Sequence, residues 1–524
     1  MHKDNIKLFI LSGIAISFFL ANISFFLQGC TKPQILRTSG PIDSLNTRSI
    51  PELPYLKMHT YDGKVYVLNK WDLDRKAKLV SGKGEYLDEN REIISKGEFT
   101  VPFDSVVITE TNVISGNSAA TGLGTASVIT GIFTAVCISD PKACFGSCPT
   151  FYAFDGHRNK LQAEGFSSSI APSLEAKDID ALYNVSLRNR DFNLEVKNEA
   201  LETHYIRYVN ILAAHHSKGN RVLATTQDKF YEVSGFLEPS LAIANEGDIK
   251  EKIRLYDGTE RFSRSDSVNL AEKETVELTF ENVPSEETGL VIACRQSLMT
   301  TFVFYQSLAY MGTKAGDWLT RLELGNNNIR KLAQNFINLG FIEILMQDKN
   351  RKWHKISEVG ETGPIAGDIK LVPIKRYDVG EKLKLRLVMT KGLWRIDYLS
   401  LAKIVGEVEP VEIHPEYAEP QYSGESKVVD LLLNNDSLLI NMPGDDYFIH
   451  YRLPDNYNEY ELFLDTKGYY IEWMRDKWIK EEEPYMVYEM FFNSAKYLKD
   501  LAPKFKAVEA SMEKSFWSSK YVRQ

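Results

Sequence analysis

The chain has 524 residues, too many for one hydrophobic core, so several domains are expected. Its formal net charge of -9 argues against a nucleic-acid partner, because binding to the phosphate backbone needs a basic patch. Aromatic residues make up 11% of the chain, a content that suits β-sheets and also surfaces that stack against sugars.

The amino terminus has the pattern of an export signal. Lys3 and Lys7 precede an uncharged, mostly apolar run at residues 8–27, and this run ends in LQGC with the cysteine at position 30. The ending resembles a bacterial lipobox, which predicts removal of residues 1–29 as a signal peptide and lipidation of Cys30, for example with palmitate. An uncleaved anchor helix is the alternative, since about 20 apolar residues can span a bilayer.

Both alternatives tether the protein to an envelope membrane. Thr31 follows the cysteine, where an Asp would hold a lipoprotein at the inner membrane. By resemblance to such sorting rules we expect the bacterial outer membrane, with the face left open. Residues 30–54 contain four prolines among Ser, Thr and Gly, a composition that predicts a flexible tether.

Residues 55–113 predict a small β-barrel-like domain. An Asp-Gly pair at 62–63 separates two strand-like runs, as in a β-hairpin. Further strands are expected at residues 78–86, 93–101 and 105–111. The segment at 114–140 is glycine-rich and almost free of charge, and it is either a buried helix or loop or a segment that contacts lipid.

Three cysteines lie close together in the sequence, Cys137, Cys144 and Cys148. They are disulfide candidates, because close cysteines usually pair in an oxidising envelope. Buried free thiols and a metal site remain alternatives, although no His stands at the spacing of a zinc finger. Cys294 lies in an apolar run and is expected in the core.

The motif PKACFGSCPTFY at residues 141–152 resembles a motif in an uncharacterised family of predicted bacterial envelope lipoproteins. The similarity extends over about residues 55–475, and four further segments carry it: FDG at 154–156, NEALET at 198–203, WRIDY at 394–398 and KGYYIEW at 467–473. The family has no assigned activity. The resemblance therefore implies a location and an architecture, and it transfers no catalytic residues.

Residues 141–240 are expected to form a β domain around the cysteine motif. A mixed α/β region should follow at 241–340, with helices near 299–309 and 329–339. Perfect alternation at 382–387 then favours a jelly-roll-like β-sandwich at residues 341–405, a fold that carries no function by itself.

The carboxyl-terminal part is expected to contain a small β unit at 406–475 and helices at 476–524. Acidic residues and a proline near position 484 predict a helix start, and Tyr485, Tyr488 and Phe492 should share one side of that helix. A last helix is expected at about 503–517. We expect both helices to pack on the sandwich or on a partner.

Three aromatic residues are candidates for a ligand surface: Trp394, Tyr398 and Trp473. Alternation along one strand puts Trp394, Ile396 and Tyr398 on the same face, which is more often core than binding surface. The surface interpretation predicts a cluster of exposed rings that stacks against a glycan.

Familiar catalytic motifs are absent from the sequence. It has no phosphate loop, no Gly-x-Ser-x-Gly elbow, no zinc motif and no EF-type calcium loop, so neither a cofactor nor a metal is expected. Paired carboxylates stay open, because glycosidase acids come from distant strands. Asp397 and Glu472 are the candidates, with structural hydrogen bonding as the alternative role.

These patterns favour a mainly β, multidomain lipoprotein with a binding or scaffolding role in a cell-envelope assembly. Its expected partners are the membrane, through the lipid anchor, and other envelope proteins. A carbohydrate-binding protein and a glycan-acting hydrolase are the alternatives, and no catalytic residue is assigned.

Overall fold

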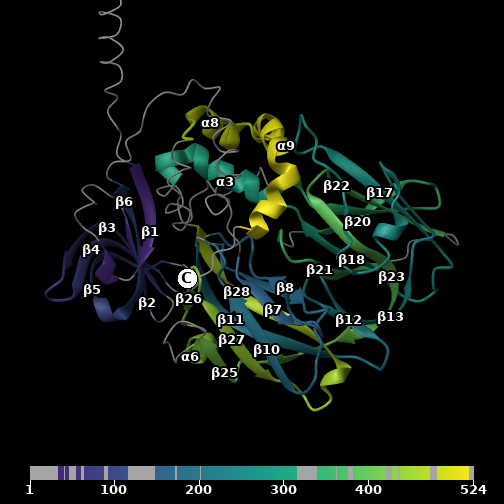
Figure 1. Ribbon diagram of the computed structural model, residues 1–524, viewed down its shortest axis with the longest axis horizontal. Helices are drawn as coiled ribbons and strands as arrows, with labels where there is room; N and C mark the ends of the chain where they lie inside the picture. The colour runs from purple at the N-terminus through teal and green to yellow at the C-terminus, as the bar shows by residue number, and fades with distance from the viewer. Residues whose placement is uncertain are drawn as a thin grey trace, which may run out of the picture.

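The computed structural model describes residues 34–40, 42–45, 55–60, 64–87, 93–115, 148–170, 174–200, 202–315, 339–360, 363–375, 382–420, 428–434, 436–472 and 481–518 (Figure 1). The fold is mainly β, as the sequence predicts, and within the described residues its strands form five sheets. The expected signal peptide, most of the segment at 114–140 and most of the helix at 329–339 lie outside the described residues, as do Cys30, Cys137, Cys144 and Trp473.

Sheet A is the amino-terminal sheet, at the left in Figure 1. It confirms the strands expected between residues 55 and 113. Its antiparallel order is β1 (Gln34–Gly40), β6 (Val106–Ser115), β2 (Leu56–Thr60), β3 (Val65–Asp74), β4 (Leu79–Leu87) and β5 (Ile93–Pro102). The 3-10 turn η3 (Phe103–Ser105) leads from β5 into β6.

The expectation of a flexible tether over residues 30–54 is wrong for its middle part. Strand β1 pairs with β6 along its whole length, from Gln34 opposite Ser115 to Gly40 opposite Thr109. The turn η1 (Ile42–Ser44) follows, and Ile42 is buried in the core of sheet A. Prolines at 33 and 41 flank this strand and leave its interior free to pair, so a proline-rich composition did not exclude it. The folded body begins four residues after position 30.

Sheets B and C form a sandwich in the lower part of Figure 1. Sheet B runs in the order β25 (Tyr417–Pro420), β27 (Asp446–Arg452), β10 (Asp191–Lys197), β7 (Thr150–Phe154) and β8 (Asn159–Glu164). Sheet C runs in the order β24 (Val411–Ile413), β11 (Glu202–His215), β28 (Tyr460–Glu472) and β9 (Ala176–Ala181), and β26 (Leu439–Asn441) also pairs with β11. Apolar side chains such as Phe151, Leu194 and Ile211 fill the space between them.

Sheets D and E form a second sandwich. Sheet D runs in the order β13 (Phe230–Leu237), β12 (Arg221–Thr225), β21 (Asp368–Ile374), β18 (Thr288–Gln296), β23 (Trp394–Val408) and β16 (Arg261–Phe262), and β13 also pairs with β23. Sheet E runs in the order β15 (Gly247–Asp248), β14 (Leu241–Ala244), β17 (Lys273–Glu281), β22 (Lys382–Thr390), β19 (Ile342–Gln347) and β20 (Trp353–Val359). The alternation expected at 382–387 is confirmed in β22, where leucines point into the core between these sheets.

The two sandwiches stack on each other, because a further apolar cluster joins sheet C to sheet D. Ile179 and Phe463 from sheet C meet Val291 and Ile369 from sheet D there. Sheet A joins sheet C through buried polar side chains: the Tyr205 hydroxyl donates to Glu110 Oε1 at 3.0 Å. The body is therefore a stack of four sheets in the order B, C, D and E, with sheet A at its side.

The expected boundaries at residues 240, 340 and 405 do not separate structural units. The B–C sandwich takes strands from residues 150–215 and again from 411–472, while the D–E sandwich takes its strands from residues 221–408 between them. The chain thus begins one sandwich, builds the second one completely, and returns to finish the first. Strand β17 from the expected mixed region pairs with β22 from the expected jelly roll over all nine of its residues, which joins 241–340 to 341–405.

Helices gather at one end of the D–E sandwich, at the top of Figure 1. They are α3 (Met299–Met311), the 3-10 turn η7 (Gly312–Lys314), α8 (Pro484–Phe492) and α9 (Ser494–Ser518); α6 (Val428–Leu433), η6 (Lys250–Lys252) and η8 (Tyr457–Glu459) lie elsewhere. The helix expected near 299–309 is confirmed as α3. None of the described helices combines the length and the apolar character needed to cross a membrane.

Helix α9 begins earlier than expected, so Pro503 lies inside it instead of at its start. A proline within a helix removes a backbone hydrogen bond. Here a long apolar stripe outweighs that loss, because side chains including Leu498, Phe505 and Phe516 are buried against α3 and the sandwich core.

The buried carboxyl group of Glu481, just before α8, should make the stability of the protein depend measurably on pH. Its side chain is buried and accepts a hydrogen bond from Gln306 Nε2 at 3.1 Å. Burial raises its pKa from 4.5 to about 7. An acid whose pKa is raised on folding binds its proton more tightly in the native state, so stability falls as pH rises through this window, by up to about 3 kcal/mol.

The substitution Glu481→Gln should remove this penalty. We expect the variant and the natural chain to unfold at similar temperatures below pH 4.5, and the variant to be the more stable one above pH 7. Thermal unfolding at both ends of the window measures this. A stability difference that does not change with pH would contradict the role assigned to Glu481.

Candidate functional site

A pocket of about 670 Å³ lies where sheets B, C and D meet the end of α9. We call it the Asp397 pocket, after the carboxylate on its wall. It combines acidic, basic and amide groups with aromatic rings. Its lining includes Tyr152, Arg158, Lys160, Tyr183, Asn184, Tyr256, Asp257, Glu260, Arg295, Ala366, Asp397 and Trp517.

An irregularity in β23 places Asp397. Strand β18 pairs Ala293 with Tyr398 and the next residue, Cys294, with Ile396, so Asp397 is an extra residue without a partner on β18. Such a β-bulge bends a strand and redirects its side chains, and bulges are frequent beside functional sites. Asp397 therefore lines the pocket although its neighbours Ile396 and Tyr398 point into cores.

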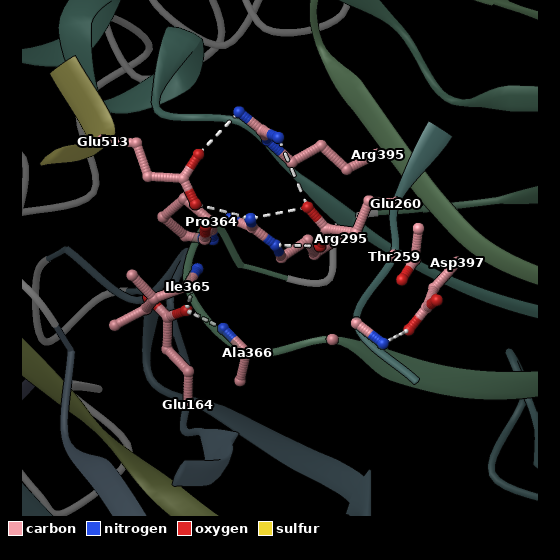
Figure 2. Close-up of polar contacts among 12 residues, drawn as sticks. Glu164, Thr259, Glu260, Arg295, Pro364, Ile365, Ala366, Arg395, Asp397 and Glu513 are labelled. Carbon is pink, nitrogen blue, oxygen red and sulfur yellow. Dashed lines mark hydrogen bonds and ion pairs between the residues drawn. The ribbon is translucent and has the colours of Figure 1, made fainter. Parts of the chain in front are cut away.

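The Asp397 carboxylate is 6% exposed and only partly satisfied. Its Oδ2 accepts the backbone N–H of Gly258 at 2.9 Å, as Figure 2 shows, while its Oδ1 has no hydrogen-bond partner among the described residues. Burial raises the pKa of Asp397 above its ordinary value, and the backbone amides of Gly258 and Asp257 oppose this rise. A buried acceptor without a partner is costly, so a ligand hydroxyl that donates to it would be stabilised.

Four charged residues form a cluster along one wall of the pocket, and two of them, Glu260 and Arg295, line it (Figure 2). Glu260 accepts hydrogen bonds from Arg295 and from Arg395 Nη1, the latter at 3.3 Å. Glu513 of α9 accepts from Nη2 of Arg295 and from Nη2 of Arg395, both at 2.6 Å. This cluster ties the end of α9 to strands β18 and β23, and it holds Glu260 in one orientation.

The segment at 364–367 forms another wall and is fixed from three sides. Arg295 Nη1 donates to the Pro364 carbonyl at 2.7 Å, and the Tyr256 hydroxyl donates to the Gly367 carbonyl at 3.0 Å. The Glu164 Oε2 accepts the N–H of Ile365 at 2.9 Å, a contact that Figure 2 draws. A wall held by side chains from three elements is pre-organised for a ligand.

Aromatic rings and exposed polar groups complete the pocket. The rings of Tyr183 and Tyr256 lie 5.5 Å apart, and the ring of Trp517, near the end of α9, is 38% exposed. Arg158 and Lys160 are exposed and carry hydrogen-bond donors. Flat rings beside donors and acceptors suit a ligand that has both apolar faces and hydroxyl groups.

The structure contradicts the expectation of a ligand surface at Trp394 and Tyr398. Trp394 is 0% exposed and lies in the core between sheets D and E. Tyr398 is half-buried against the apolar cluster between sheets C and D, and it does not share a face with Trp394 because the bulge at Asp397 lies between them. Neither residue lines the pocket. Trp473 lies outside the described residues.

The structure separates the two carboxylates suggested as an acid pair. Asp397 lines the pocket, whereas Glu472 is buried at the end of β28, opposite Glu202 on β11, and accepts a hydrogen bond from the Tyr305 hydroxyl at 3.1 Å. Asp257 and Glu260 line the pocket together with Asp397, and after burial their charges add to the rise of its pKa. The sequence did not indicate Glu260 or Trp517 as site residues. The nearest signal in the sequence was the Asp-Gly pair at 257–258, just before Glu260.

The structure does not test the expected disulfide, and it shows no metal site among the residues that it describes. Cys148 is buried next to β7, and its candidate partners Cys137 and Cys144 lie outside the described residues, so the disulfide stays a prediction. Cys294 is buried in sheet D, as expected. Among the residues that the structure describes, no three His, Cys, Asp or Glu side chains are grouped as metal ligands would be.

Comparisons with known proteins place the chain in no family. No family model matches it, and no curated protein matches it. A solved structure of BuGH86 in complex with neoagarooctaose matches with a TM-score of 0.16 and 6% identity, over 44% of this chain and 34% of that one. The GH31 α-xylosidase from Xanthomonas citri matches with a TM-score of 0.14 and 6% identity, over 81% of this chain and 38% of that one. Scores this low carry no argument about function.

Proposed function

We propose that this protein is a membrane-tethered lipoprotein of the bacterial envelope that binds a glycan, without catalysis, in the Asp397 pocket. The observation that carries the proposal is Asp397, which lines an aromatic-lined pocket and whose buried Oδ1 has no hydrogen-bond partner among the described residues. A glycan hydroxyl would supply the missing hydrogen bond, and ring faces of the sugar would pack on the aromatic side chains.

Size and charge support a glycan over other ligands. The volume of about 670 Å³ falls within the range of about 300–1,000 Å³ that is typical of small-molecule sites. The charges of the cluster along one wall of the pocket balance, because the two arginines Arg295 and Arg395 share two glutamates, Glu260 and Glu513. Such a wall favours a polar, uncharged ligand over a strongly anionic one.

The tether rests on the amino-terminal sequence pattern. A signal-like run followed by LQGC predicts a lipid on Cys30, and β1 begins four residues later. The glycan-binding body would then be held directly at an envelope membrane, where cell-surface or cell-wall glycans are within reach. The outer membrane remains our expectation for its location.

The substitution Asp397→Asn tests the proposed site. It keeps the size of the side chain but replaces one carboxylate oxygen by an N–H donor, so we expect at least about tenfold weaker glycan binding. The measurement is a glycan array followed by calorimetry of the best ligand with purified mature chain. The matched control is Asp74→Asn in sheet A, where the exposed Asp74 also accepts backbone amides but lies far from the pocket. Unchanged affinity of the Asp397 variant, or no glycan bound by the natural chain, overturns the proposal.

A glycan-acting hydrolase is the second candidate, and one observation favours it. Asp397 lines one pocket with two other carboxyl groups, Asp257 and Glu260, and burial raises its pKa; carboxyl groups that share a pocket are what a glycosidase needs as acid and base. Product analysis after incubation with the bound glycan separates the two functions. If the natural chain produces new reducing ends and the Asp397→Asn variant does not, the function is hydrolysis and not binding alone.

A further inference from the structure

The outer surface of α8 is aromatic where a surface helix is usually polar. Tyr485, Tyr488 and Phe492 are 54%, 58% and 62% exposed, and the rings of Tyr488 and Phe492 stack 5.1 Å apart. The opposite side of the helix carries Met486 and Met490, which are buried in the core with α3. The sequence predicts that the three aromatic residues share one side, and the structure places large parts of these side chains at the surface of the molecule.

The same part of the molecule receives the amino-terminal tether. Strand β1 contacts η7, the turn directly after α3. The segment that leads into α8 lies against the same turn, because a Cβ atom on Gly312 would come within 2.5 Å of the Glu482 Cβ, and the Glu483 N–H donates to the Tyr310 carbonyl at 3.0 Å. Figure 1 shows β1, α3 and α8 together at one end of the molecule.

The short connection to Cys30 limits how far this end can lie from a membrane. Three residues separate Cys30 from Gln34, the first residue of β1, so the chain takes four residue steps from one to the other. Even when fully extended, such a segment reaches about 14 Å. A lipid on Cys30 would therefore keep β1 and its neighbours η7 and α8 close to the bilayer surface.

We propose that the aromatic face of α8 docks on the lipid surface into which the acylated Cys30 is inserted. This inference rests on the lipid anchor of the proposed function. Tyrosine and phenylalanine rings are suited to the boundary between headgroups and acyl chains, where one side of the ring is apolar and the surroundings are wet. Lys496 lies 5.1 Å above the Tyr485 ring and holds that ring from one side, while its ammonium pairs with Asp500 at 2.7 Å. A lipid chain and an interfacial helix together form two attachment points and give the body a defined orientation.

The orientation has a consequence for the Asp397 pocket. Helix α9 follows α8 directly and ends beside the pocket with Trp517. From Ser494 to Trp517 a helix rises by about 35 Å. With α8 on the membrane, α9 would hold the pocket away from the lipid, where it can meet a large glycan.

The test uses the full acylated chain, purified and reconstituted into vesicles of phosphatidylethanolamine and phosphatidylglycerol. The photoreactive residue p-benzoylphenylalanine replaces Tyr488 in one sample and Leu433 in the matched control. Leu433 is 50% exposed at the end of α6, which lies at the opposite end of the molecule in Figure 1. After irradiation, mass spectrometry identifies the adducts, and the mass of the amino-terminal peptide shows whether Cys30 is acylated.

We expect several-fold more lipid adducts at position 488 than at position 433. If Cys30 is acylated but position 488 gives no excess of lipid adducts, the docking proposal is wrong and the lipid anchor stands. Lipid adducts at position 488 on a chain whose Cys30 is not acylated would contradict the proposed lipidation and support the docking of α8. If the same substitution in intact cells yields protein adducts instead of lipid adducts, the face binds a protein and the lipid proposal is wrong. Glycan binding is measured separately, so its failure is distinguishable from all of these outcomes.

Discussion

The substitution Arg295→Met is expected to lower the free energy of unfolding by about 3–5 kcal/mol and to abolish ligand binding in the Asp397 pocket. Arg295 is 8% exposed and binds Glu260, Glu513 and the Pro364 carbonyl at once. Without it, two carboxylates lose their main partner in a partly buried place, and both the 364–367 wall and the end of α9 lose a contact that holds them.

Denaturant unfolding and calorimetry with a bound glycan measure the two effects. The matched control is Arg386→Met on sheet E. Arg386 also pairs with a glutamate, Glu277, but this pair is 30% and 48% exposed, so we expect at most about 1 kcal/mol of destabilisation and unchanged binding. Equal losses in the two variants would show that the cluster around Arg295 has no special role.

The second large effect is expected for Trp394→Ala. Trp394 is completely buried between sheets D and E, and removing such a side chain leaves a cavity that costs about 3–5 kcal/mol. Binding per folded molecule should stay unchanged, because Trp394 does not line the pocket.

The control for this variant is Trp353→Ala on β20. Trp353 is only half-buried and packs under the Arg386 guanidinium, 4.1 Å from the ring centroid, so its removal should cost about 1 kcal/mol or less. Thermal unfolding and glycan binding are compared for both variants. Lost binding with full stability in the Trp394 variant would restore the ligand surface that the sequence suggested at this residue.

Local strand and helix structure could be predicted well from the sequence. The expected strands at 78–86 and 93–101 match β4 and β5 to within one residue at each end, and the expected helix near 299–309 is α3. These elements depend on side-chain alternation or helical spacing within one short segment, so the information lies in the segment itself. Strand β1 was missed because its flanking prolines resemble those of a linker.

Only part of the site could be predicted from the sequence. Asp397 drew attention as a carboxylate among aromatic residues, but its expected partner Glu472 belongs to another sheet, and the carboxylates that share the pocket with it are Asp257 and Glu260. The β-bulge that exposes Asp397 to the pocket arises from pairing with β18, a strand about a hundred residues earlier in the chain. Trp517 reaches the pocket because the ion pairs of Glu513 fix the end of α9 there.

The sequence by itself determined the period of each element and the side that its apolar residues share, and it carries the amino-terminal pattern on which the predicted lipid anchor rests. Tertiary structure alone decided what covers each side. Tyr485, Tyr488 and Phe492 share a face that turned out to point outward, and Trp394 lies in a core although it resembled a ligand contact. The nesting of the D–E sandwich within the B–C sandwich was also decided at this level. The physical reason is that periodicity identifies an apolar face, whereas burial depends on which distant segment packs against it.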